Sequence, residues 1–120
     1  LGFTLIEMLV VMAIVAMLLT IAVPRYFGSL ERSKETALKQ NLMVVRDVID
    51  KFYADNGRYP EDLEELVQKK YLRAIPIDPV TESDKTWIPV VLTEKEKKGL
   101  SDIKSGAEGQ ASDGSAFEKL

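Results

Sequence analysis

Carboxylates are the main groups capable of chemistry in this sequence of 120 residues, which contains no histidine and no cysteine. Imidazole acid–base catalysis, thiolate nucleophiles and metal sites built on His or Cys are therefore excluded. A bound metal would have to be a hard cation held by oxygen atoms, in practice calcium or magnesium. The net charge of -3 gives no global attraction for nucleic acid. We therefore expect neither an enzyme nor a nucleic-acid-binding protein.

Two stretches outside the N-terminal segment contain carboxylates that could belong to a site, residues 61–65 and 105–115. The first follows Pro60, which is predicted to be the first residue of a short helix. Negative charge in the first turn complements the helix dipole, and this explains the cluster better than a metal or catalytic site. The second stretch is rich in Gly, Ser and oxygen donors, but its spacing does not fit an EF-hand. From its residues alone it is interpreted as a polar surface loop.

Glu7 is the one charge in the apolar segment 3–23, which contains no Gly or Pro. As a helix this segment would span about 31 Å, the thickness of one hydrocarbon core. It has neither the basic region nor the small-residue cleavage site of a secretory signal, and a small core cannot enclose a helix that is apolar all round. A membrane helix is therefore predicted, with Glu7 either hydrated at the interface or close to a cation.

An amphipathic helix is predicted to continue from residue 25 to residue 56. Its apolar positions recur at spacings of four and three residues, so they should form one buried stripe. The stripe consists of Leu38, Leu42, Val45, Ile49 and Phe52, widened by Ala37, Val48 and Tyr53. Pro24 should kink the helix or open it locally, and Asn56-Gly57 should end it.

Short apolar segments at residues 87–92 and 100–104 predict a small antiparallel sheet of two or three strands. Pro89 restricts the first of them to an edge strand or an irregular one. The charged residues 93–99 between them are expected to form a mobile loop. Since nothing else can cover the apolar stripe of the long helix, the sheet should pack against it. The predicted fold class is α+β.

The run Gly2-Phe3-Thr4-Leu5-Ile6-Glu7-Met8-Leu9-Val10-Val11 resembles the prepilin processing signal of type IV pilins and type II secretion pseudopilins. The similarity continues through the apolar run to Pro24. Gly57-Arg58-Tyr59-Pro60, followed by a short Leu-rich helix, is similar to the major, G-like pseudopilins. This resemblance implies a type IV pilin-like fold, in which a long N-terminal helix packs against a small antiparallel β-sheet headgroup.

The resemblance also implies a role for each residue of the motif. A prepilin peptidase would cleave between Gly2 and Phe3, and Phe3 would then be N-methylated. Glu7 would pair with the terminal amine of a neighbouring subunit, and Pro24 would belong to the same assembly segment. The chain would divide into the end of a leader (1–2), a transmembrane and filament-core helix (3–24), its amphipathic continuation (25–56) and a headgroup (57–120).

A structural calcium ion is implied for the C-terminal loop by the same resemblance. G-like pseudopilins end in a similar Ser-x-Gly-Ala-Asp-Gly segment followed by a second Asp. Asp113 matches the second acidic ligand, and Glu108 stands where the first Asp is usual. The hydroxyl groups of Ser112 and Ser115 would help to complete a shell of six to eight oxygens.

The expected function is that of a structural subunit of a helical periplasmic pseudopilus of a type II secretion system. The chain would be a single-pass protein of the bacterial inner membrane with its C-terminal domain in the periplasm. Its partners would be further copies of itself, minor pseudopilins, the inner-membrane assembly platform and ATPase, the prepilin peptidase and the lipid bilayer.

Two alternatives remain open. Residues 73–99 lack the usual Asp-Pro-Trp-Gly pattern, which leaves room for a type IV pilus subunit, although pilins often carry a C-terminal disulfide and this sequence has no Cys. The other alternative is a membrane-tethered periplasmic binding domain. A simple tether would give no reason for Glu7 or for the Gly2-Phe3 junction.

Overall fold

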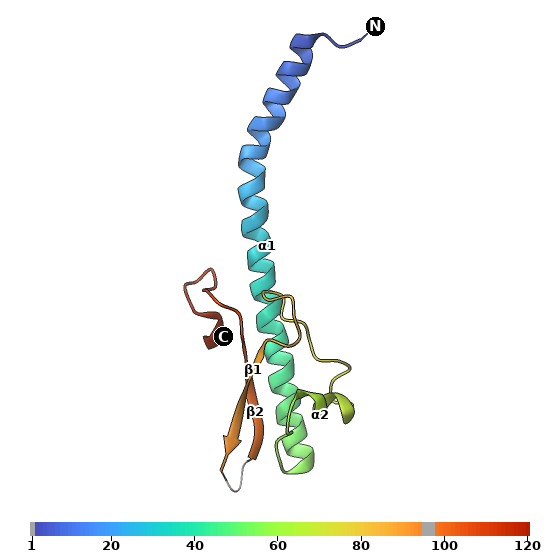
Figure 1. Cartoon of the computed structure of the whole chain (residues 1–120), viewed down its shortest axis with the longest axis vertical. Helices are drawn as coiled ribbons and strands as arrows, with labels where there is room; N and C mark the ends of the chain where they lie inside the picture. Colours follow the sequence, from blue (N-terminus) through green and yellow to red (C-terminus); the bar gives the residue numbers. More distant parts are fainter. Residues whose placement is uncertain (1, 95–97) are drawn as a thin grey trace. The chain divides into compact units, whose positions relative to one another are not determined.

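The computed structural model describes residues 2–94 and 98–120. The elements of these residues are, in chain order, α1 (Leu5–Asn56), α2 (Leu63–Gln68), β1 (Trp87–Thr93), β2 (Lys98–Ser105) and a short 3-10 helix, η1 (Phe117–Lys119) (Figure 1). The chain divides into two compact units, Leu1–Ser33 and Lys34–Leu120. The predicted α+β, pilin-like architecture of a long N-terminal helix and a small antiparallel sheet is confirmed.

The first unit consists of the N-terminal part of α1 and the few residues before it. The helix begins at Leu5, two residues later than the predicted start at residue 3. It continues through Pro24 without a break. Pro24 was predicted either to kink the helix or to open it locally. The local opening is not seen, and the kink stays a prediction.

In the second unit, the apolar stripe of α1 forms one wall of the core. The predicted stripe residues are buried as a set: Leu38, Leu42, Val45, Ile49 and Phe52. Val48 packs against this core, whereas Ala37 is exposed. The inclusion of Ala37 in the stripe was wrong. Successive residues of a helix are turned by about 100°, so Ala37 lies to one side of the stripe that begins at Leu38.

The connection from α1 to α2 differs from the prediction. Gly57 ends α1 with a positive φ of 68°, as expected for a glycine that follows a helix. Pro60, however, is not the first residue of α2: it is buried, and its carbonyl accepts the N–H of Leu100 at 2.7 Å. The side chain of Asp62 caps α2 instead, by accepting the N–H of Glu65 at 2.9 Å.

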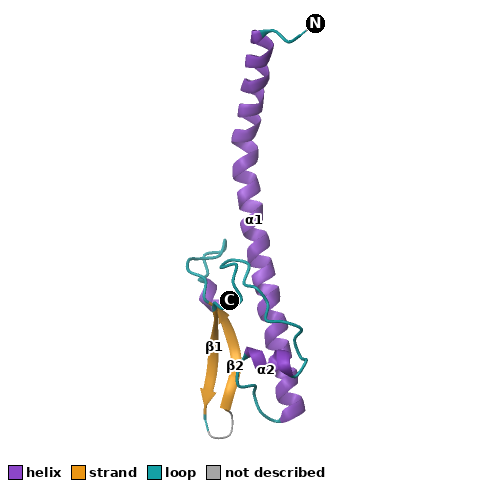
Figure 2. Ribbon diagram, turned by 45° about the vertical axis from the view of Figure 1, so that its right-hand side comes forward, coloured by secondary structure: helices purple, strands orange, loops and turns teal. Residues whose placement is uncertain are grey.

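The sheet of the described residues has two antiparallel strands, within the predicted range. Trp87 pairs with Ser105 at one end and Thr93 with Lys98 at the other, with a bulge between Val90 and Val91. In both views β2 lies between β1 and α1 (Figures 1 and 2). Burial agrees with this order, because β2 contributes the fully buried Leu100 and Ile103, whereas β1 buries only Trp87 among its apolar residues.

Residues 93–99 were predicted to form a mobile loop, but Thr93 belongs to β1, and Lys98 and Gly99 belong to β2. Lys95, Glu96 and Lys97 lie outside the described residues. Pro89 lies within β1, opposite Ile103. A strand with one unpaired edge tolerates proline, so the prediction of an edge strand is confirmed.

A buried carboxylate fixes the long connection between α2 and β1. Asp78 is fully buried, and its Oδ2 accepts the hydroxyl of Ser105 at 2.5 Å. Its Oδ1 accepts the N–H of Val80 at 2.8 Å, and the indole N–H of Trp87 binds the carbonyl of Pro76 at 2.7 Å. These bonds hold the connection against the end of β2.

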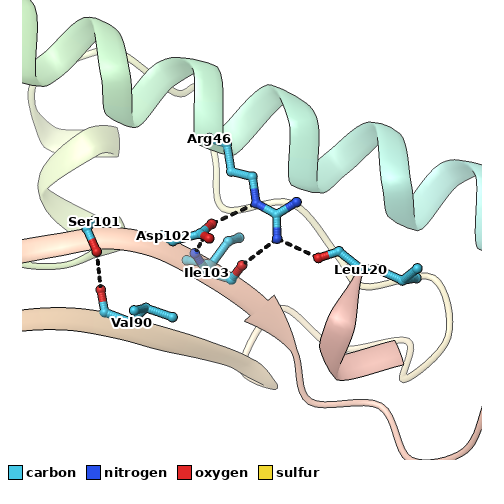
Figure 3. Close-up of polar contacts among 6 residues, drawn as sticks. All are labelled: Arg46, Val90, Ser101, Asp102, Ile103 and Leu120. Carbon is cyan, nitrogen blue, oxygen red and sulfur yellow. Dashed lines mark hydrogen bonds and ion pairs between the residues drawn. The ribbon is translucent and has the colours of Figure 1, made fainter. Parts of the chain in front are cut away.

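Arg46 joins α1 to β2 and to the last described residue (Figure 3). Its Nε donates to Asp102 Oδ1 at 2.7 Å, and its Nη2 donates to the main-chain oxygens of Ile103 at 3.1 Å and Leu120 at 2.7 Å. The planar guanidinium group can make these bonds together because its donors point in fixed directions.

Candidate processing and assembly site

The Gly2–Phe3 peptide bond lies in the short non-helical segment before α1. Both residues are exposed, and the side chain of Phe3 is 81% exposed. A Cβ atom added to Gly2 would meet no atom within 4 Å, and no positive φ is found there. Nothing in residues 2–94 and 98–120 therefore requires glycine at this position, so a requirement for it would have to come from another molecule.

Thr4 and Glu7 form a reciprocal cap at the start of α1. The N–H of Glu7 donates to Thr4 Oγ1 at 3.1 Å, and the N–H of Thr4 donates to Glu7 Oε2 at 3.2 Å. This arrangement is a capping box, which satisfies two of the backbone N–H groups that a helix start leaves unpaired. This cap was not predicted, although a Thr three residues before a Glu, at the start of an apolar run, is the sequence signal for it.

The Glu7 carboxylate keeps one oxygen open for a further interaction. Within the described residues, its Oε2 accepts the Thr4 N–H, and no hydrogen bond or ion pair is found at its Oε1. A carboxylate on a surface that enters lipid or packs against apolar neighbours costs several kcal/mol unless it is protonated or paired with a cation. The geometry of Glu7 is therefore suited to accepting a second, cationic donor.

The surface that follows Glu7 is apolar and exposed on every side of the helix. In the part of α1 from Leu5 to Val23 no residue is buried, and an 18-residue window has a mean hydropathy of 2.7. The hydroxyl of Thr20 binds the carbonyl of Ala16 at 2.8 Å, so its hydrogen is satisfied within the helix. By length and composition α1 could cross a membrane.

Two of the predicted calcium ligands lie together in the C-terminal loop. Asp113 Oδ1 accepts the N–H of Ser115 at 2.9 Å and its hydroxyl at 2.7 Å. These two hydrogen bonds from Ser115 favour the ionised carboxylate and lower the pKa of Asp113. An ionised carboxylate beside a hydroxyl is a suitable pair of donors for a hard cation.

The other two predicted ligands have different surroundings. Both the N–H and the hydroxyl of Ser112 donate to the carboxylate of Glu35 on α1, each at 2.7 Å. Glu108 is exposed, and no described contact joins it to Asp113. Glu35 was not among the predicted site residues, because nothing in the sequence indicates that a residue so distant along the chain faces this loop.

The donor set is therefore present only in part. Among the residues that the structure describes, no three Asp, Glu, His or Cys side chains lie close enough together to hold a metal ion. The predicted set has only two carboxylates and relies on hydroxyl and carbonyl oxygens for the rest. Calcium binding stays a prediction.

A capped and exposed apolar helix that runs into an α+β headgroup defines a pilin-like protein. In agreement, the family model of the prokaryotic N-terminal methylation motif matches residues 1–23. Over 94 aligned residues the chain is 32% identical to the type II secretion system core protein G of Pseudomonas aeruginosa. It is 30% identical to that of Klebsiella pneumoniae. The chain belongs to the type II secretion system core protein G family.

The extent of these matches is limited. They cover 65% of this chain, with 66% of the Pseudomonas relative and 67% of the Klebsiella relative, so the chain spans about two thirds of the length of these relatives. The type IV major pilin protein of Myxococcus xanthus is 35% identical over 65 residues, which are 54% of this chain and 30% of that protein. Comparison with solved structures gives no significant match.

Proposed function

We propose that this chain is a structural subunit of the helical pseudopilus of a type II secretion system, which helps to export folded proteins. The observation that carries the proposal is the exposed apolar surface of α1 from Leu5 to Val23, headed by the capped Glu7. An apolar surface of this extent needs lipid or other apolar surfaces to cover it. Lipid covers it in the stored, single-pass subunit, and neighbouring copies cover it in the filament.

Processing prepares the subunit for assembly. The exposed Gly2–Phe3 bond is accessible to a prepilin peptidase, and cleavage turns Phe3 into the new N-terminal residue, which is then methylated. The terminal amine of one subunit supplies the cation that the Glu7 carboxylate of a neighbour requires. Thr4 keeps that carboxylate at the start of the helix while the second carboxylate oxygen receives the amine.

The partners that follow from this function are further copies of the chain, minor pseudopilins, the prepilin peptidase and the inner-membrane assembly platform with its ATPase. The role of the chain is structural and not enzymatic. Residues 57–120 form the headgroup, which lies in the periplasm. A structural calcium ion is part of the same proposal, held by Asp113, Ser115 and Glu108 with Ser112, and it would steady the loop between β2 and η1.

The experiment combines cleavage with assembly. In a host that expresses prepilin peptidase, mass spectrometry of filaments should give a methylated Phe3 as the N-terminal residue. Glu7→Gln should be processed and should insert in the membrane, but it should form few filaments. Glu31→Gln, which removes an exposed carboxylate further along α1, is the matched control and should assemble normally. An intact Gly2–Phe3 bond in filaments, or wild-type assembly of Glu7→Gln, would contradict the proposal.

A second candidate function is that of a type IV pilus subunit. The similarity to the Myxococcus pilin over 54% of the chain favours it. Complementation separates the two functions, because a pseudopilin restores secretion to a strain that lacks its own core protein G. A pilus subunit would instead restore surface pili to a pilin deletion strain.

A further inference from the structure

The last turn of α1 places an asparagine directly before a glycine. Of the two asparagines in the sequence, Asn41 is followed by Leu42 and Asn56 by Gly57. Glycine has no side chain to shield its backbone nitrogen, and a Cβ atom added to Gly57 would meet no atom of the described residues within 4 Å. Asn56 is exposed. The Asn56 side chain and the Gly57 nitrogen are therefore a pair of groups that can close a five-membered ring.

Closure of this ring releases ammonia. The backbone nitrogen of Gly57 gives up its proton and attacks Cγ of Asn56. The new bond between this nitrogen and Cγ replaces the Cγ–Nδ2 bond, and the side-chain amide leaves as ammonia. Water then opens the resulting succinimide at either of its carbonyls, which gives aspartate or isoaspartate. The reaction consumes only water and needs no enzyme or oxidant, and it is one reason why asparagine is a thermolabile residue.

The folded helix opposes this reaction at both reacting groups. The N–H of Gly57 donates to the carbonyl of Tyr53 at 2.8 Å. Asn56 has a helical backbone, whereas the ring fixes its ψ angle outside the helical range. Its side-chain amide donates to the carbonyl of Phe52 at 3.0 Å and to the hydroxyl of Tyr71 at 3.3 Å. Ring closure therefore requires the last turn of α1 to open.

This opening does not require the headgroup to unfold. Residues 55–58 are exposed, and the last residue of α1 that belongs to the buried core is Phe52. A helix end opens at a much lower free energy than the core that it adjoins. Because the turn closes again much faster than the ring forms, the rate of deamidation is proportional to the fraction of chains in which this turn is open.

The product alters the contacts of the Tyr71 hydroxyl. This hydroxyl donates to Asp55 Oδ2 at 2.6 Å and accepts the amide of Asn56. The hydrogen bond to Asp55 raises the pKa of Tyr71, so the hydroxyl stays protonated. After deamidation, two carboxylates compete for one hydroxyl hydrogen at the negative end of the helix dipole. The deamidated headgroup is therefore less stable than the original one.

We propose that Asn56 is a site of spontaneous deamidation, and that local opening of the last turn of α1 sets the rate of this modification. The Tyr71 hydroxyl slows the reaction because it holds the amide against the closed turn. The product accumulates with the age of each molecule and weakens the contact between α1 and the segment that follows α2. The chemistry requires no filament, so it is independent of the proposed function.

Incubation of the full-length protein in detergent micelles tests the rate. Mass spectrometry of the peptide that contains Asn56 follows the exchange of NH₂ for OH, and chromatography separates the aspartate and isoaspartate products. We expect slow conversion in the folded protein and fast conversion in urea. Tyr71→Phe removes the hydroxyl but keeps the ring, whose centroid lies 5.2 Å from that of Phe52. It should accelerate conversion of the folded protein by about 2- to 10-fold, the factor that one typical hydrogen bond contributes.

The matched control is Asp78→Ala. It removes contacts with Val80 and Ser105 and therefore weakens the headgroup without touching the last turn of α1. Near-ultraviolet circular dichroism of Trp87 verifies that each variant is folded. Asp78→Ala should convert at the rate of the natural chain. Equal acceleration by both variants would overturn the local opening, as would an unchanged rate in Tyr71→Phe. A natural chain that stays unconverted even in urea would overturn the site itself.

A second pair of variants tests the effect of the product. Asn56→Asp reproduces the aspartate product and should lower the melting temperature of the full-length protein. Asp55→Asn/Asn56→Asp exchanges the amide and the carboxylate and keeps the net charge of the natural chain, so it should recover most of this loss. An unchanged melting temperature of Asn56→Asp would contradict the destabilising effect. An equal loss in the exchanged variant would contradict the competition of two carboxylates for Tyr71.

Discussion

Thr4 and Glu7 cap one another at the start of α1, the threonine through its hydroxyl oxygen and the glutamate through one carboxylate oxygen. The same glutamate thus stabilises its own helix and can receive a cation from a neighbour. Glutamine also functions at the third position of a capping box, whereas valine cannot act as the cap itself. Substitutions at the two positions can therefore separate capping from charge.

Thr4→Val should weaken the start of α1 by about 1 kcal/mol, because one cap hydrogen bond is lost while the charge of Glu7 remains. Glu7→Gln should keep the cap and lose the charge. Amide hydrogen exchange of residues 5–8 in detergent micelles should therefore accelerate in Thr4→Val and remain slow in Glu7→Gln. The opposite pattern would show that Glu7 does not cap the helix through this geometry.

A fragment that begins at about residue 29 should fold by itself as a monomer. Its buried apolar residues, from Leu38 to Phe117, all lie within the second unit. The surface that requires lipid or neighbours lies before it. Sedimentation equilibrium should give the monomer mass, and near-ultraviolet circular dichroism should show an ordered Trp87. Large oligomers or an unfolded fragment would contradict this division.

Asp78→Ala should destabilise this fragment. The substitution leaves the hydroxyl of Ser105 and the N–H of Val80 without their buried acceptor, at a cost of about 1–3 kcal/mol for each unpaired group. In urea unfolding, the double variant Asp78→Ala/Ser105→Ala should lose less than the sum of the two single variants. Strict additivity would mean that the two side chains do not act as one unit.

Lys70→Gly should stabilise the fragment. At the end of α2 the N–H of Tyr71 binds the carbonyl of Leu66 at 2.9 Å, and this return of the chain places Lys70 at a φ of 66°. Glycine adopts this conformation without strain, so we expect a gain of about 0.5–1 kcal/mol in the free energy of unfolding. Lys69→Gly removes the same charge at a φ of -85° and should give no gain. Equal effects of the two variants would point to charge and not to backbone conformation.

Calcium should raise the melting temperature of the fragment. Binding to the folded state at 100 times Kd contributes about 2.7 kcal/mol. Asp113→Ala should abolish the difference between melts in calcium and in chelator, whereas Asp84→Ala, at an exposed position outside the loop, should preserve it. Identical melts of the natural fragment in both conditions would exclude a structural calcium ion.

The periodic parts of this fold could be predicted from the sequence. The buried set Leu38, Leu42, Val45, Ile49 and Phe52 follows from helical spacing, and the exposed apolar segment follows from its length and composition. The prepilin-like motif could be recognised because its residues are contiguous in the sequence. The matching family model confirms it. These features depend only on near neighbours in the chain.

The remaining features depend on partners far along the chain. Asp78 is buried because Ser105 binds it, and Pro60 stays outside α2 because its carbonyl pairs with Leu100. The position of Arg46, outside the apolar stripe of the helix, predicts an ordinary solvated side chain. In the structure it donates hydrogen bonds to Asp102 and to the main-chain oxygen of Leu120. The Thr4 cap was the exception, since its local signal was present and was overlooked.

Two features of β1 affect whether closely packed subunits aggregate through their strand edges. A two-stranded sheet leaves each strand with one unpaired edge, and such edges can join those of other chains to form fibrils of the amyloid kind. Pro89 has no N–H to offer to an added strand, and the bulge between Val90 and Val91 interrupts the regular repeat of the backbone. These two features oppose the edge-to-edge aggregation of headgroups that lie close together.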